Sequence, residues 1–197
     1  ILYSNSSVKS PNSSANTLAA TLGVTYQIDA DTHPSYNTTA AFDKVTQPIH
    51  FNVVLRGGIQ EGRVIGLGQK PFVVVSGYAD KRLSFKSSIQ LGVDAIFAKF
   101  LETEIAYSAA AFPQNGVTGD EDYKRVGIFV GYEMHINKLS IIGQVGYYAY
   151  YPFKFESRVY LRPGIKYYIS EKVFAVVTLK SHWASAENVA FGVGFRI

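Results

Sequence analysis

Apolar and polar residues alternate along the second half of the chain, in five successive runs after residue 122. In the first run, Val126 and Ile128 alternate with Arg125 and Gly127. A period of two places alternate side chains on opposite faces, so each run predicts a β-strand with one apolar and one polar face. The short connections between the runs predict antiparallel hairpins. The five runs cover residues 125–136, 139–151, 158–170, 173–183 and 189–197.

The first half of the chain contains four further runs of the same kind, which brings the expected number of full strands to nine. Two longer connections separate them, at residues 29–47 and 98–121, and the second is expected to begin with a short helix at 99–102. Residues 1–4 resemble the end of one more strand. The four runs cover residues 17–28, 50–59, 71–79 and 82–97.

The length and polarity of the runs indicate which solvent each face meets. The runs exceed the usual five or six residues of a strand, and the longest reach the roughly 9–11 residues that cross a bilayer at a tilt. Their polar faces suit a packed or wet interior. We therefore expect an all-β fold, an antiparallel transmembrane barrel of outer-membrane type with up-and-down meander topology. A soluble ligand-binding barrel would instead carry its apolar residues inside.

Aromatic residues near the ends of the expected strands support this interpretation. Tyr and Trp side chains concentrate where a membrane meets water, and a girdle of them is typical of transmembrane barrels. The chain is 14% aromatic and only 17% charged. The expected girdle residues are Tyr147, Tyr150, Tyr151, Tyr167, Tyr168 and Trp183.

Length and composition are compatible with one domain over residues 1–197. The absence of cysteine excludes a disulfide framework and thiolate metal sites. No run of about 18 apolar residues predicts a transmembrane helix. A net charge of +4 could favour anionic lipid headgroups, but we expect it to reflect a few interior Arg and Lys side chains. We expect no cofactor, no metal ion and no nucleic-acid partner.

The start of the chain suggests that the barrel is larger than this sequence. The sequence begins at Ile1 without a Met or a signal peptide, although an outer-membrane barrel must be exported. Nine strands are also an odd number, whereas single-chain bacterial barrels have an even one. We therefore expect further strands upstream of Ile1, with residues 1–197 forming part of a larger barrel.

A histidine, a serine and a carboxylate lie close together near the last expected hairpin. His182, Ser185 and Glu187 fall within six residues, the residue types of a hydrolase triad. However, Trp183 separates the faces and Ser185 falls in the turn. We therefore expect His182 to point inward, with Lys180 and Glu187 as its polar partners.

Two further groups of polar residues are candidates for function. Glu133 and His135 share the inward face of one strand, and we expect them to form an interior network with Arg158 and Arg162. An acidic loop at 120–122 is expected to be solvated, with a divalent-cation or lipopolysaccharide contact as the alternative. No spacing of metal ligands appears.

Several segments resemble the acyloxyacyl hydrolase family, the lipid A 3-O-deacylase-like outer-membrane barrels of Bacteroidetes-type bacteria. The resemblance is to the C-terminal half of that family, and it implies a bacterial outer-membrane location and an acyl-ester hydrolase ancestry. The segments that carry it are FNVVLRGG at 51–58, KRLSFKSSIQLGVDAIF at 81–97, VGIFVGYEMHINKLS at 126–140, QVGYYAYYPFK at 144–154, GIKYYIS at 164–170 and LKSHWASAENVAFGVGFRI at 179–197.

The resemblance also places the catalytic motif of the family at the start of this chain. There it implies Ser4 as nucleophile, followed by Asn5, with Asn16 at the position of the acid. The general base would be two residues before the serine, but that position holds Leu2, which cannot accept a proton. Losing the base of such a unit typically costs several orders of magnitude in rate.

We therefore expect a pseudoenzyme that serves as a structural or accessory subunit of an envelope complex. Its expected partners are outer-membrane lipid, lipopolysaccharide and other outer-membrane proteins. The alternative is an active lipid A acyl-ester hydrolase that uses Ser4 with a base from elsewhere, either His182 or a residue upstream of Ile1. A passive pore is a third possibility, which bulky charged interior residues disfavour.

Overall fold

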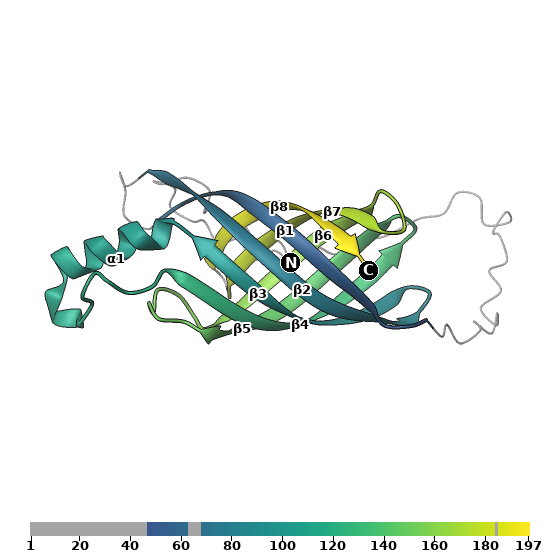
Figure 1. Ribbon diagram of the computed structural model, residues 1–197, viewed down its shortest axis with the longest axis horizontal. Helices are drawn as coiled ribbons and strands as arrows, with labels where there is room; N and C mark the ends of the chain where they lie inside the picture. The colour runs from purple at the N-terminus through teal and green to yellow at the C-terminus, as the bar shows by residue number, and fades with distance from the viewer. Residues whose placement is uncertain (1–46, 63–67, 184) are drawn as a thin grey trace, which may run out of the picture.

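A computed structural model describes residues 47–62, 68–183 and 185–197. Its strands form one closed antiparallel barrel in which each strand pairs with the next and β1 pairs with β8 (Figure 1). The topology is therefore an up-and-down meander, as expected. The strands are β1 (His50–Glu61), β2 (Gln69–Ser84), β3 (Ser87–Ala98), β4 (Lys124–Ile136), β5 (Leu139–Tyr150), β6 (Val159–Tyr168), β7 (Val173–His182) and β8 (Ser185–Arg196).

The eight described strands correspond to eight of the nine expected ones. They are 10 to 16 residues long, enough to cross a bilayer at a tilt. The ninth, expected at 17–28, lies outside the described residues, as does the stub at 1–4. The pairing of β1 with β8 closes the barrel within residues 50–196.

The side chains alternate across the barrel wall in the expected sense. Outward positions are apolar and open to the surroundings, as for Leu91 (64% exposed) and Val130 (58%). Inward positions on the same strands carry Asp94 (1%) and Glu133 (0%). This inside-out arrangement suits a wall in contact with hydrocarbon and a polar, packed lumen.

The boundary between β2 and β3 differs from the expectation. The run at 82–97 was expected to be one strand, but β2 continues to Ser84 and β3 begins at Ser87. The turn holds two residues, Phe85 and Lys86. A two-residue turn alone would move the inward positions from even to odd residue numbers. The register shift between Arg82 and Ser84 adds one residue to β2, so even-numbered residues such as Asp80 and Ser88 face inward on both strands and the alternation passes through the hairpin without a visible break.

The two ends of the barrel carry different connections. At one end the turns β2–β3, β4–β5 and β6–β7 span two to four residues, and we call it the short-turn end. At the other end β3 and β4 are joined through helix α1 (Phe100–Ala111) and the 3-10 helix η2 (Pro113–Asn115). Helix α1 lies beyond that end of the barrel (Figure 1). In the described part of the chain, no helix has the length and apolar character to cross a membrane.

Helix α1 is longer than the short helix expected at 99–102, and its first two turns pack into the end of the barrel opposite the short-turn end. Phe100, Leu101 and Ile105 are buried against barrel residues such as Phe72 and Tyr148. Burial of these side chains against the barrel explains the helix, since its weak amphipathic pattern does not predict one.

The expected girdle is confirmed at four positions and wrong at two. Tyr147, Tyr150 and Tyr167 face outward, as does Trp183 at 70% exposure. Tyr168, by contrast, turns into the lumen, where its hydroxyl donates to Glu133. The other inward exception is the ring of Tyr151, which stacks on Tyr148.

Glycines on the inner wall make room for aromatic rings in the lumen. Any side-chain carbon at Gly127 or Gly146 would overlap the buried ring of Tyr160. The ring of Phe174 lies against Gly194 in the same way. An eight-stranded barrel is just wide enough for side chains to fill. Here an aromatic ring fills the space that is left open beside each of these glycines.

Candidate functional site

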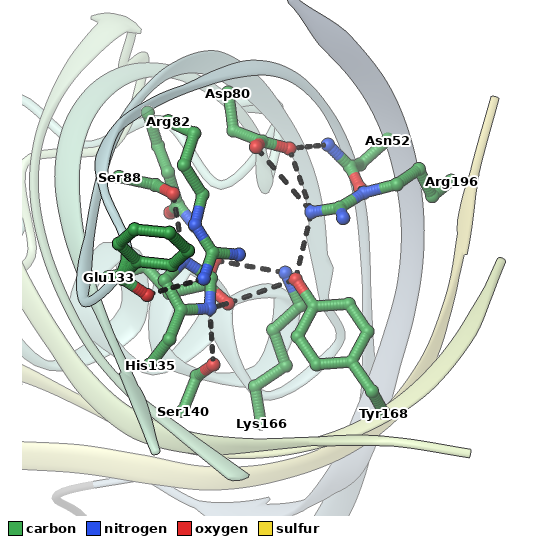
Figure 2. A network of polar contacts seen from close by, with 12 residues as sticks. Asn52, Asp80, Arg82, Ser88, Glu133, His135, Ser140, Lys166, Tyr168 and Arg196 are labelled. Atoms are coloured by element: carbon green, nitrogen blue, oxygen red, sulfur yellow. Dashed lines mark hydrogen bonds and ion pairs between the residues drawn. The ribbon is translucent and has the colours of Figure 1, made fainter. Parts of the chain in front are cut away.

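Near the short-turn end, Glu133 of β4 is the centre of a buried polar network, which we call the lower network (Figure 2). Its carboxylate accepts hydrogen bonds from the Lys166 ammonium at 3.0 Å and from the Gln90 amide at 2.7 Å. The Tyr168 hydroxyl donates to its other oxygen at 3.0 Å. Burying a carboxylate is costly unless it is paired and hydrogen-bonded, and here both oxygens have partners.

His135 lies beside Glu133 and is held between two serines. The Ser88 hydroxyl is 2.7 Å from Nε2, and the Ser140 hydroxyl is 3.0 Å from Nδ1 (Figure 2). The Glu133 carboxylate is 3.6 Å from Nδ1. A serine, an imidazole and a carboxylate in this order form the relay that activates serine nucleophiles. Ser88, however, has no exposed surface, so a substrate carbonyl cannot reach it in this conformation.

Asp80 joins the network from β2. It receives a hydrogen bond from Asn52 at 2.5 Å and pairs with Arg196 at 3.2 Å. Arg196 also donates to the Tyr168 hydroxyl at 2.8 Å, which links Asp80 to the partners of Glu133 (Figure 2). The contacts run between β1, β2, β6 and β8, so they tie opposite walls of the barrel together.

A second network, the middle network, surrounds Asp94 of β3. Arg162 donates to both of its oxygens, one of them at 3.2 Å. Tyr160 and Ser76 donate to the same carboxylate, at 2.5 and 2.6 Å. Arg56 in turn donates to Ser76 at 2.5 Å. Two cations and one carboxylate, all buried, therefore share a hydrogen-bonded cluster.

An apolar layer separates the lower network from the middle network. It comprises the buried side chains Val54, Tyr78, Phe129, Ile142, Phe174 and Val176. Because Tyr78 also accepts from Lys166 through its hydroxyl, it connects this layer to the lower network.

The third cluster confirms the inward orientation expected for His182. Its Nε2 lies 2.7 Å from the Glu187 carboxylate, which also pairs with Lys180 at 2.7 Å. Its Nδ1 lies 2.9 Å from the backbone carbonyl of Val159. Ser185 is exposed and does not enter the cluster. With both ring nitrogens engaged, His182 cannot take a proton from Ser185, so no triad forms here.

The expected network of Glu133 with Arg158 and Arg162 is wrong in its cations. Lys166 is the cation that pairs with Glu133, whereas Arg162 pairs with Asp94. Arg158 is exposed, and its guanidinium packs over an outward aromatic ring. Arg162 and Lys166 are four residues apart on β6, about 13 Å along a strand, so they serve different layers.

The acidic loop is organised by its own backbone. The Glu121 carboxylate accepts from the backbone N–H groups of Thr118 and Gly119, at 2.8 and 3.0 Å. The hydrogen bond from Thr118 is the largest cause of its lowered pKa. Asp122 accepts from Tyr150 and lies 3.9 Å from Lys124. Among the described residues, no group of His, Asp and Glu has the arrangement of a metal site.

Three residues of the expected catalytic motif, Leu2, Ser4 and Asn16, lie outside the described residues. Sequence reasoning also missed Ser88 and Asp94 as partners of inward residues. Both occupy inward positions of β3, and Ser88 pairs in register with Glu133 on β4. An inward hydroxyl beside an inward carboxylate on the next strand is a signal that register alone could have supplied.

These observations define the class of protein. A closed eight-stranded antiparallel barrel with an apolar outer wall and a hydrogen-bonded, ion-paired lumen is a transmembrane β-barrel of outer-membrane type. Residues 49–197 match the family described as "Acyloxyacyl hydrolase, C-terminal domain", and the chain belongs to this family. The matched stretch coincides with the closed barrel.

The other comparisons add little to this assignment. Among curated proteins, none matches the chain. Among solved structures, the chain is similar to one titled "De novo design of transmembrane beta-barrels", with 14% identity and a TM-score of 0.46. That likeness covers 78% of this chain and 99% of the designed one.

Proposed function

We propose that the chain is a bacterial outer-membrane barrel without hydrolytic activity that serves as a structural or accessory subunit of an envelope complex. The observation that carries the proposal is the pairing of the buried carboxylates in the lumen. The carboxylates of Asp94, Glu133 and Glu187 are each held by buried cations and hydrogen-bond donors. Groups arranged in this way hold the strands together, and each of these carboxylates is already engaged with a cation inside the barrel.

The outer-membrane location is supported by the asymmetry of the two ends. Bacterial barrels of this membrane have short periplasmic turns and longer extracellular loops, with an apolar band between them. The short-turn end and the end that carries α1 match this pattern. Membership of the acyloxyacyl hydrolase family supports the same location.

The absence of hydrolysis is supported by the position of the catalytic motif. Ser4 and Asn16 both precede residue 49, where the family match begins. The base position before Ser4 holds Leu2. Among the described residues of the matched barrel, the serines hydrogen-bonded to a histidine are Ser88 and Ser140, and both have no exposed surface.

One observation favours the second candidate, an active lipid A acyl-ester hydrolase. Ser88, His135 and Glu133 stand in the order of a catalytic relay, with 2.7 Å between the hydroxyl and the imidazole. A rearrangement of the lower network that exposed Ser88 would complete it. The two candidates therefore differ in whether an ester reaches a serine.

Mass spectrometry of lipid A from matched membranes, with and without the full-length protein, tests the proposal. We expect identical lipid A in both. Loss of one ester-linked acyl chain only when the protein is present would overturn it. In that case Ser4→Ala and Ser88→Ala, each made separately, would show which serine acts, and Ser185→Ala would be a matched control with an exposed serine.

The accessory role requires that the outer wall of the barrel contact another membrane protein. If the chain packs against other membrane proteins, then purification in mild detergent should recover it with the same partner from repeated preparations. Recovery of the barrel alone, at full yield and folded, would argue against the accessory part of the proposal and leave a structural barrel.

A further inference from the structure

The short-turn end of the barrel opens into a cavity of about 930 Å³, which we call the vestibule. Its wall comes from five parts of the chain: the start of β1, Arg82 on β2, the β4–β5 turn, the β6–β7 turn and the end of β8. The lower network of Figure 2 lies at this end of the lumen, and His135, Tyr168 and Arg196 belong both to it and to the vestibule wall.

The charged side chains around the vestibule are predominantly cationic. Arg82, Lys138, Lys172 and Arg196 line it, and the facing carboxylate is that of Glu171. Even when the buried Asp80 beside Arg196 is counted, the positive side chains exceed the negative ones by two. Clefts with one sign of charge and low-dielectric walls concentrate ions of the opposite sign.

The two guanidinium groups of the vestibule are held in place before any ligand arrives. Arg196 is fixed by Asp80 at 3.2 Å and by the hydroxyl of Tyr168 at 2.8 Å. Arg82 donates from Nε to the backbone carbonyl of Ser84 at 3.1 Å. It donates a second hydrogen bond, from Nη2, to the backbone carbonyl of Phe85. A fixed guanidinium loses less conformational entropy when it binds an anion.

The two lysines differ from the arginines in their freedom. Lys138 and Lys172 are exposed residues of the β4–β5 and β6–β7 turns. Within the described part of the chain, no carboxylate lies within ion-pair distance of either ammonium group. They can therefore swing toward an anion that the arginines hold.

We propose that the vestibule is a binding site for a phosphate group. Guanidinium groups donate charge-assisted hydrogen bonds to phosphate oxygens, and ammonium groups add charge without fixed geometry. An excess of two positive side chains matches a phosphate dianion. The cavity is larger than one phosphate, so the group belongs to a phospholipid headgroup or to a soluble phosphorylated molecule. The site is independent of whether the barrel hydrolyses esters.

The test is a calorimetric titration of the full chain in a non-ionic maltoside detergent with inorganic phosphate at low ionic strength. We expect saturable binding that the double variant Lys138→Gln/Lys172→Gln weakens by about tenfold or more, the loss typical of removing charge-assisted hydrogen bonds. The matched control is Lys86→Gln. Lys86 is an exposed residue of the β2–β3 turn at the same end, but it does not line the vestibule.

Three results would overturn the proposal: no saturable binding, equal loss in Lys86→Gln and the double variant, or chloride competing as well as phosphate. Both variants change exposed turn side chains only, and the shift in gel mobility on heating verifies that each is folded.

Nanodiscs distinguish the two sources of the phosphate group. If a headgroup occupies the vestibule, inorganic phosphate should bind more weakly in phosphatidylglycerol discs than in phosphatidylcholine discs, and the double variant should remove that difference. If the natural ligand is soluble, phosphate should bind equally in both discs after the effect of surface charge is subtracted. The Lys86→Gln variant, measured in both discs, gives the size of that effect.

Discussion

Asp94 is the residue on which the middle network depends. Its carboxylate receives hydrogen bonds from Arg162, Tyr160 and Ser76, and three different strands meet there. Removing one partner of a buried pair leaves the other charge without compensation, which costs more than the pair itself contributes.

Asp94→Asn should therefore destabilise the barrel by about 3–5 kcal/mol, because Arg162 keeps its charge in a buried site. Urea unfolding in lipid vesicles measures this. The control is Lys124→Gln, since the exposed pair of Lys124 with Asp122 at 3.9 Å should contribute less than about 1 kcal/mol. A loss for Asp94→Asn as small as that of the control would show that the middle network is not a stabilising unit.

Gly146 and Gly143 lie on the same strand but face opposite sides of the wall. A side-chain carbon at Gly146 would overlap the ring of Tyr160, whereas Gly143 has open space around it. Gly146→Ala should cost about 1–3 kcal/mol through overpacking, and Gly143→Ala should be close to neutral. The same unfolding assay compares them, and equal effects would mean that Tyr160 does not pack against the wall as described.

At the residue scale, the sequence predicted which side chains point inward better than it predicted which residues they contact. The inward positions of Glu133, His135 and His182 followed from period two, as did the pairing of His182 with Glu187, a neighbour across one hairpin. The partner of Glu133 did not follow, because contacts across the lumen depend on the stagger between strands that are not adjacent.

At the scale of elements, alternation predicted the described strands but not all of their limits. The hairpin at Phe85 and Lys86 was hidden because the register shift between Arg82 and Ser84 keeps even-numbered residues inward on both strands. Helix α1 was underestimated for another reason: its stability comes from packing Phe100 and Leu101 against the barrel mouth, which no local pattern encodes.

The outward face of β4 allows a direct test of membrane contact. Val130 is at the middle of the strand and Ile136 is its last residue, and both are exposed. Val130→Arg should cost about 2–4 kcal/mol in a bilayer, and Ile136→Arg about 0–1 kcal/mol, because the cost depends on depth. Unfolding in vesicles should show this difference. Equal costs would contradict the placement of β4 across the hydrocarbon.

At the scale of the whole molecule, the lumen is stratified. The lower network, the apolar layer, the middle network and the cluster around Glu187 follow one another toward the end that α1 covers. Contacts such as Lys166 to Glu133 and Arg162 to Asp94 cross the barrel, so side chains occupy the space that a passive pore would need.

This stratified lumen could be predicted from the sequence only in outline. Polar inward residues and a filled interior followed from the alternation and from the bulky charged side chains. The relay of Ser88, His135 and Glu133 and the cationic vestibule needed the closed barrel, because their members come from different strands and turns.

We propose that no serine of this chain is an activated nucleophile. Treatment of the folded full chain in nanodiscs with a fluorophosphonate, followed by intact mass spectrometry, tests it most directly, with an active serine hydrolase as positive control. We expect an unmodified mass, because Ser88 has no exposed surface and the proposed base position before Ser4 holds Leu2. A stoichiometric adduct, mapped by peptide mass to Ser88 or Ser4, would contradict it and establish a serine hydrolase.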